Sequence, residues 1–118
     1  MRRNWLVQPL CPLDSVSDGT ARGFTVPDPE GRVEIFVLRR GPGALGYVNS
    51  CPHVGTPLDI IPDQFLTADR RHFLCRTHGA LFRLEDGHCV AGPCKGKSLE
   101  PVPVRVEAGQ IVLGGRTK

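Results

Sequence analysis

Glycine and proline recur along the whole chain, and this feature constrains the fold more than any other. They account for 14 and 11 of the 118 residues, respectively. Glycine permits positive φ angles, and proline fixes φ and lacks an N–H donor, so both residues interrupt helices. No segment longer than about ten residues keeps a helical period. We therefore expect an all-β domain of short antiparallel strands, arranged as a β-sandwich or a small barrel.

Two segments have the pattern of a β-hairpin. The β-rich run 33–38 is separated from the apolar run 45–48 by a Gly-Pro-Gly turn. Further on, valine alternates with other residues over 101–106, and an Ala-Gly turn leads into the apolar run 111–113. The two prolines of 101–106 mark an edge strand, because proline lacks the donor that a second neighbouring strand would need.

Between these hairpins, two short strands are expected on either side of a loop. The strands are 72–75 and 81–84, and the loop between them is Arg76-Thr77-His78-Gly79. Asp86-Gly87 adds a further turn signal. The segment therefore predicts a second, smaller set of strands in the middle of the chain.

The length of 118 residues is that of one compact domain, 1–118, without a second catalytic domain. The net charge of +3 is small and the arginine pairs are scattered, which argues against a nucleic-acid partner. The basic N-terminus is followed by only three apolar residues, too few for a signal peptide, and no stretch approaches the ~20 apolar residues of a membrane span. We expect a cytoplasmic monomer with no membrane partner.

Four residues typical of metal ligands lie in two short loops. Cys51 and His53 form a C-x-H pattern, and after 21 intervening residues Cys75 and His78 form a C-x2-H pattern. Two thiolates and two imidazoles satisfy either tetrahedral zinc or a 2Fe-2S cluster with two histidine ligands. Zinc fingers usually pair like ligands within each short motif, whereas each loop here supplies one Cys and one His. The mixed loops therefore favour two irons over one zinc.

The same loops resemble those of the Rieske family of 2Fe-2S proteins, and most closely its small soluble ferredoxins. The similar segments are 49–58, with the sequence NSCPHVGTPL, and 75–82, with the sequence CRTHGALF, followed by Gly92-Pro93. The resemblance implies a Rieske-like antiparallel β-fold with a cluster-binding part at about 47–95. It also implies one cluster per chain, covered by the Gly92-Pro93 loop.

The resemblance further implies a role for each of the four ligands. Cys51 and Cys75 would bind the buried iron, and His53 and His78 would bind the outer iron. No catalytic residue is expected.

Four positions depart from the high-potential branch that this chain resembles in its loops. That branch has an extra cysteine in each loop, joined as a disulfide, where this chain has Thr56 and Thr77. It also has a serine and a tyrosine that donate hydrogen bonds to cluster sulfur, where this chain has Ala80 and Phe82. Without these donors, the midpoint potential is expected near the low end of the Rieske range, about −150 mV.

The resemblance implies an electron carrier rather than an enzyme. Such a ferredoxin passes single electrons from a flavin-dependent reductase to a terminal oxidoreductase such as an oxygenase. One alternative is a small subunit of a larger reductase, similar to that of assimilatory nitrite reductase, although such subunits usually lack the cluster ligands. Another is a zinc-stabilised interaction module.

The other three cysteines are expected to be small core residues. They are Cys11, Cys89 and Cys94, and the last two flank the Gly92-Pro93 turn closely enough to approach each other. Cytoplasmic thiols normally stay reduced, so whether this pair forms a disulfide remains open.

Two surface features also allow two interpretations. The basic residues Arg70, Arg71, Arg76, Lys95 and Lys97 are either a solvated rim or a docking surface around the cluster end. The apolar run 58–62 is either a contact face or a buried segment between the loops.

Overall fold

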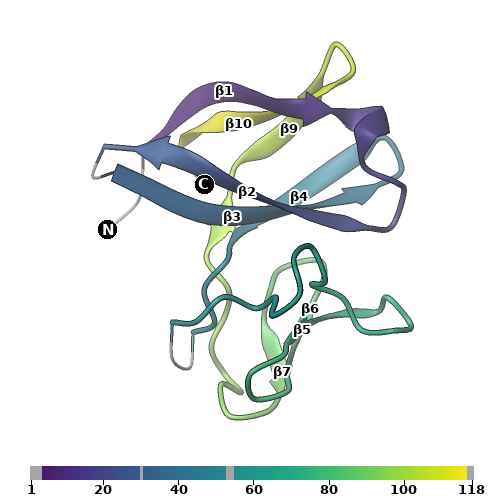
Figure 1. Ribbon diagram of the computed structural model, residues 1–118, viewed down its shortest axis with the longest axis vertical. Helices are drawn as coiled ribbons and strands as arrows, with labels where there is room; N and C mark the ends of the chain where they lie inside the picture. The colour runs from purple at the N-terminus through teal and green to yellow at the C-terminus, as the bar shows by residue number, and fades with distance from the viewer. Residues whose placement is uncertain (1–3, 30, 53–54, 117–118) are drawn as a thin grey trace.

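The computed structural model describes residues 4–29, 31–52 and 55–116, which form two larger sheets and one smaller sheet (Figure 1). The strands are β1 (Asn4–Pro12), β2 (Ala21–Asp28), β3 (Gly31–Arg40), β4 (Gly43–Val48), β5 (His72–Cys75), β6 (Ala80–Arg83), β7 (Cys89–Ala91), β8 (Pro101–Val102), β9 (Val104–Glu107) and β10 (Gln110–Arg116). A short 3-10 helix, Leu13–Ser15, follows β1. The expected all-β antiparallel architecture is confirmed.

Two sheets pack on each other and a third lies beside them. The strand orders of the packed sheets are β1-β10-β9 and β2-β3-β4-β8, and that of the small sheet is β5-β6-β7 (Figure 1). All strand pairs in the three sheets are antiparallel. The small sheet is entered after β4 and left before β8, so it is an insertion between two strands that pair with each other.

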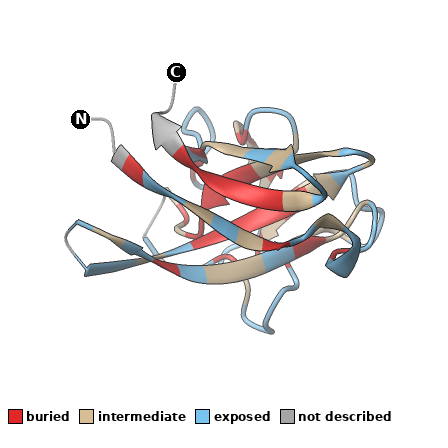
Figure 2. Ribbon diagram, turned by 90° about the horizontal axis from the view of Figure 1, so that it is seen from above, coloured by how far each residue is buried: buried red, intermediate tan, exposed pale blue. Residues whose placement is uncertain are grey.

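Strand β3 is buried on both of its faces. Ile35 and Val37 pack toward the β1-β10-β9 sheet, whereas Phe36 and Leu38 pack toward the small sheet. Figure 2 shows buried segments in the middle of the strands and exposed segments in the loops. All four side chains are at most 1% exposed. Burial on two sides explains why this strand is a continuous apolar run instead of an alternating one.

Both expected hairpins are confirmed. The 33–38 and 45–48 runs pair as β3 and β4, and the 111–113 run pairs as part of β10 with β9. The Ala108-Gly109 turn has φ angles of 50° and 77°, which is the sign combination of a type I′ hairpin turn.

The expected edge strand 101–106 is divided between two sheets. Its first part, β8, pairs with β4, and its second part, β9, pairs with β10. Pro103 lies at the division and both parts are at a sheet edge. Proline at this position therefore ends one pairing and starts the other.

The two N-terminal strands, β1 and β2, have no clear strand pattern in the sequence. β1 pairs with β10 with two register shifts, which interrupt the alternation of buried and exposed side chains. Within β1, Leu6 and Val7 are exposed, whereas Trp5 is buried and anchors this segment. In the part of the chain that the structure describes, no helix is long and apolar enough to cross a membrane.

Aromatic packing attaches the small sheet to β3 and β4. Phe36 stacks on Phe65 with ring centroids 4.4 Å apart, and Phe73 of β5 meets Phe36 edge-on at 5.0 Å. Tyr47 of β4 also contacts Phe73, and its hydroxyl donates to the carbonyl oxygen of Leu84 at 2.9 Å. These contacts set the position of the loops that the small sheet carries.

Candidate metal centre

The two loops that begin with Cys51 and Cys75 are closed by the same backbone hydrogen bond. The N–H of Gly55 donates to the carbonyl oxygen of Cys51 at 2.7 Å, and the N–H of Gly79 donates to that of Cys75 at 2.8 Å. Both glycines have left-handed backbone conformations, with φ of 78° and 74°. A β-carbon makes this conformation costly, so glycine is required at the same place in each loop. The two loops are thus closed in the same way.

The thiols of the two loops lie together in the core. Cys51 and Cys75 are each 0% exposed and belong to the same buried cluster as Ala80 and Phe82. His78, three residues after Cys75, is exposed at the surface. His53 lies outside the described residues. The structure therefore gives each described loop a buried thiol and gives the second loop a histidine at the surface.

The donor set fits a Rieske-type cluster, in which one iron takes two cysteines and the other takes two histidines. In such a cluster, the two buried thiols would bind the inner iron, and the exposed imidazole would bind the outer iron. Within 4–29, 31–52 and 55–116, no three ligating side chains gather around a single point. A cluster of this type has two protein ligands at each iron, and one of the four proposed ligands, His53, lies outside the described residues.

A third loop packs against the second one. Gly92 has a φ of 98°, and a β-carbon there would lie 2.8 Å from the Cα of Ala80. Only glycine allows this approach, because real β-carbons do not come so close to backbone atoms. The Gly92-Pro93 loop is thereby held against the end of the 75–79 loop. Ala80 and Phe82 are both 0% exposed.

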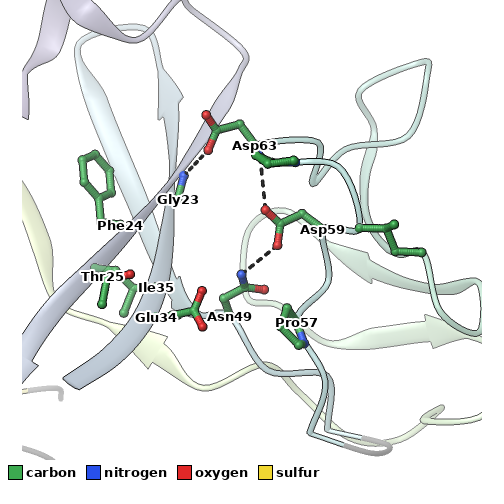
Figure 3. Close-up of a pocket in the computed structure, with 11 residues that line it drawn as sticks. Gly23, Phe24, Thr25, Glu34, Ile35, Asn49, Pro57, Asp59 and Asp63 are labelled. Carbon is green, nitrogen blue, oxygen red and sulfur yellow. Dashed lines mark hydrogen bonds between the residues drawn. The ribbon is translucent and has the colours of Figure 1, made fainter. Parts of the chain in front are cut away.

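A hydrogen-bond network holds the segment that follows the first loop (Figure 3). The side-chain amide of Asn49 donates to Asp59 at 2.9 Å, and its oxygen accepts from the N–H of Leu58 at 2.8 Å. The other carboxylate oxygen of Asp59 accepts from the N–H of Asp63. The Asp63 carboxylate in turn accepts from the N–H of Gly23 in β2 at 2.8 Å. The network links the first loop to the larger sheet.

Sequence reasoning did not identify this network. Its residues line a cleft of about 330 Å³ between β2, β3 and the 57–63 segment (Figure 3). The signal was a polar residue, Asn49, placed directly after a buried strand. Asn49 is 7% exposed, and a buried amide normally has hydrogen-bond partners.

In both of the ambiguous surface features, some residues are buried and others are exposed. Of the basic residues, Arg76 is partly buried, and its guanidinium donates to the carbonyl oxygens of Gln64 and Leu66. Arg70, Arg71, Lys95 and Lys97 are exposed. In the apolar run, Leu58 is fully buried, whereas Ile60 and Ile61 are 66% and 54% exposed. The run therefore contains one core residue and two surface residues, so neither interpretation applies to all of it.

The remaining cysteines are buried thiols, as expected for core residues. Cys11 packs in a separate cluster between the larger sheets. The Sγ of Cys94 donates to the Sγ of Cys89 at 2.9 Å. Burial, followed by the neighbouring thiols of Cys89 and Cys51, raises the pKa of Cys94 to about 12. The thiol of Cys94 therefore neighbours both Cys89 and the candidate ligand Cys51.

The model of the Rieske [2Fe-2S] domain family matches residues 6–108. A chain from the complex of reduced oxygenase and oxidized ferredoxin in carbazole 1,9a-dioxygenase is similar in structure, with a TM-score of 0.74, 23% identity and 98% of each chain covered. The ferredoxin of carbazole 1,9a-dioxygenase from Nocardioides aromaticivorans IC177 has a TM-score of 0.71 and 21% identity over 92% of this chain and 97% of its own.

A larger protein contains the same fold. The terminal oxygenase of carbazole 1,9a-dioxygenase from Novosphingobium sp. KA1 has a TM-score of 0.76 and 18% identity, over 99% of this chain and 31% of its own. Comparison with curated proteins gives no significant match.

Proposed function

Because the chain belongs to the Rieske [2Fe-2S] domain family, we propose that it is a one-electron carrier, a Rieske-type ferredoxin. When bound, a Rieske cluster accepts and returns a single electron. The observation that carries the proposal is the pair of loops that each begin with a buried cysteine. In each loop a glycine N–H donates to the carbonyl oxygen of that cysteine.

Each of the four ligands has a distinct task in this proposal. Cys51 and Cys75 hold the inner iron from inside the core, where water is excluded. His53 and His78 hold the outer iron, and the exposure of His78 supports an electron exit at the surface. The Gly92-Pro93 loop shields the thiol side through its contact with Ala80.

The proposed partners are a flavin-dependent reductase as electron donor and a terminal oxygenase as acceptor. Support for the acceptor comes from the similar structures, which are named as a ferredoxin, a terminal oxygenase and a complex of the two types of protein. The same structures support a carrier role, since two of them are named as a ferredoxin or as containing one. Ile60 and Ile61 offer exposed apolar contacts on the segment after the first loop.

Metal analysis tests the site. Purified protein should contain two irons and two acid-labile sulfides per chain, and reduction should give an EPR signal with an average g below that of the free electron. Cys51→Ala and Cys75→Ala should each abolish stable assembly. Cys11→Ser is the matched control, because Cys11 is also buried but lies in a separate cluster, and it should keep full iron content. Stoichiometric zinc without labile sulfide would overturn the proposal.

Electron transfer is tested separately. With NADH and a flavin-dependent reductase, the rate of cytochrome c reduction should rise with the concentration of the protein. Apoprotein should give no increase, because it lacks the electron-accepting group. A holoprotein that keeps its cluster but stays oxidised in the presence of the reductase and of chemical mediators of low potential would contradict the carrier role.

A further inference from the structure

We propose that Cys89 and Cys94 form a reversible dithiol–disulfide pair, a site of oxidative modification beneath the Gly92-Pro93 loop. The inference goes beyond the electron-carrier function, because neither cysteine is among the four proposed cluster ligands. It rests on the contact between the two thiols and on the backbone that maintains this contact.

The two sulfur atoms are already close together in the dithiol state. They are 2.9 Å apart, and each side chain is 1% exposed. A disulfide has an S–S bond of about 2.05 Å, so the atoms must approach by about 0.9 Å. Side-chain rotation and a small loop movement are sufficient for this change.

The loop backbone returns Cys94 to a position over Cys89. Cys89 begins β7 and is paired with Phe82 of β6. Its N–H donates to the carbonyl oxygen of Lys97 at 2.8 Å, and the N–H of Lys97 donates to the carbonyl oxygen of Cys94 at 2.9 Å. These two hydrogen bonds close the segment 89–97 on itself. The thiol contact is therefore enforced by the fold rather than by chance orientation of two flexible side chains.

Other thiol pairs are less suited to the reaction. Cys51 also neighbours Cys94, but in the proposed holoprotein its thiolate is occupied by iron. Cys75 is the second proposed ligand and is occupied in the same way. Cys11 lies in a different cluster, between the two larger sheets. Cys89 is thus the partner that remains available to Cys94.

The reaction balances with a low-molecular-weight disulfide, such as glutathione disulfide, as the oxidant. One cysteine thiolate attacks the disulfide and forms a mixed disulfide, with release of the first thiol of the oxidant. The second cysteine then displaces the other thiol and closes the Cys89–Cys94 bond. Two electrons and two protons pass from the protein to the oxidant, which leaves as two thiols.

Cys94 is the residue that the oxidant reaches first. Its thiol is buried and protonated while the loop is closed. Both of its sequence neighbours, Pro93 and Lys95, are exposed, so a local opening of the loop brings the thiol into contact with water and the oxidant. Cys89 lies within the small sheet and is uncovered only when its strand separates. The finished disulfide replaces the thiol contact under the loop by a covalent bond. The proposed ligands are left unchanged.

The experiment uses the full-length holoprotein under anaerobic conditions. The protein is incubated with glutathione disulfide, quenched in acid to stop thiolate exchange, and alkylated in denaturant. We expect alkylation of all five cysteines before oxidation and of only three afterwards. Trypsin releases both cysteines in one peptide, 84–95, which should be unalkylated and two hydrogen atoms lighter than its dithiol form. Dithiothreitol should restore both alkylation sites.

Single variants serve as controls. Cys94→Ser should retain four alkylated cysteines after oxidation. Cys89→Ser should retain three and carry one glutathione on Cys94, because no second thiol is left to displace the mixed disulfide. Cys11→Ser should lose two of its four. If either variant at the loop fails to fold, the mass of the wild-type peptide 84–95 decides the question alone.

Three results would overturn the inference. In the wild-type protein, they are a stable glutathione adduct on peptide 84–95, loss of alkylation at Cys51 or Cys75, and full alkylation after prolonged oxidation. None of these readouts depends on electron transfer, so failure of this inference and failure of the proposed function are distinguishable.

Discussion

Ala80 and Phe82 are buried in the same cluster as Cys51 and Cys75, at the two positions where the high-potential Rieske branch has hydrogen-bond donors, and we expect them to influence the midpoint potential. Neither has a hydroxyl group, so neither can stabilise added charge by a hydrogen bond. Ala80→Ser combined with Phe82→Tyr should therefore raise the midpoint potential measured by protein-film voltammetry. A hydrogen bond to a charged group contributes about 1.5–3 kcal/mol, which corresponds to roughly 60–130 mV for one electron.

The single variants separate the two contributions. Ala80 is in close contact with Gly92, so serine there has less room than tyrosine at position 82 and should give the smaller shift. Leu81→Met, between them on β6, is a control that adds no donor. A wild-type midpoint above about +100 mV would contradict the low-potential assignment, because it lies in the upper part of the Rieske range.

Asn49 is the buried polar residue on which the first loop depends. Asn49→Ala removes both of its hydrogen bonds and leaves the N–H of Leu58 without its acceptor. The free energy of unfolding in urea should fall by about 1–3 kcal/mol, the usual cost of a buried unsatisfied group. Gln64→Ala, an exposed change nearby in the same segment, should have little effect. Equal stability of the two variants would show that the network contributes nothing.

At the scale of strands, the sequence predicted the elements that have a regular pattern. The β3–β4 and β9–β10 hairpins follow from apolar runs separated by turn residues, and β5 and β6 flank the expected loop. β1 was not predicted, because its two register shifts break the alternation that identifies a strand. β2 contains Gly23 and Pro27, which are typical of turns, and it forms because β3 provides a full-length partner.

The site was predictable to the same degree. The motif spacing identified Cys51 and Cys75, and the structure brings both into one buried cluster. The sequence alone did not decide whether Cys89 and Cys94 are in contact, since this depends on how the 92–97 loop returns to β7. The partners of Asn49 were beyond sequence reasoning, because Leu58 and Asp59 reach it only after the loop has folded.

Tyr47 joins strand β4 to the turn after β6, and its ionisation reports on this contact. Burial, followed by the carboxylates of Asp86 and Glu85, raises the pKa of Tyr47 from 10.0 to about 12. It is the only tyrosine in the chain, so the tyrosinate absorbance in the near ultraviolet measures this one group. We expect half-ionisation near pH 12, with Tyr47→Phe as the spectroscopic blank. Ionisation close to pH 10 in the folded protein would contradict this packing.

The raised pKa has a defined effect on stability. The unfolded chain loses the phenolic proton near pH 10, whereas the folded chain keeps it until about pH 12. The contribution of Tyr47 to folding is therefore complete below pH 10 and is lost as the pH rises through the folded pKa. Between these values, wild-type protein should lose stability more steeply with pH than Tyr47→Phe, as measured by urea unfolding.

At the scale of the whole molecule, two contacts besides those of Tyr47 hold the small sheet and its loops against the larger sheets. The first is the aromatic contact of Phe36 with Phe65 and Phe73, and the second is the hydrogen bond from Gly23 of β2 to Asp63. Periodicity assigns strands but does not assign them to sheets, so neither attachment was predictable. The division of 101–106 at Pro103 is a further example, because each part satisfies the same pattern in a different sheet.

The attachment at Asp63 can be tested with a nearly isosteric pair of variants. Asp63→Ala removes the carboxylate that accepts the N–H of Gly23, and it also places alanine at a φ of 68°. Asp63→Asn keeps an oxygen acceptor and a residue that tolerates this conformation. In hydrogen–deuterium exchange, the segment 55–64 should exchange faster in Asp63→Ala than in wild type, and Asp63→Asn should resemble wild type. Strand β3 should be unchanged in both variants, because it is buried on two faces independently of this contact. Faster exchange across β3 as well would mean that the loop segment and the larger sheets open together, and that Asp63 is not a separate point of attachment.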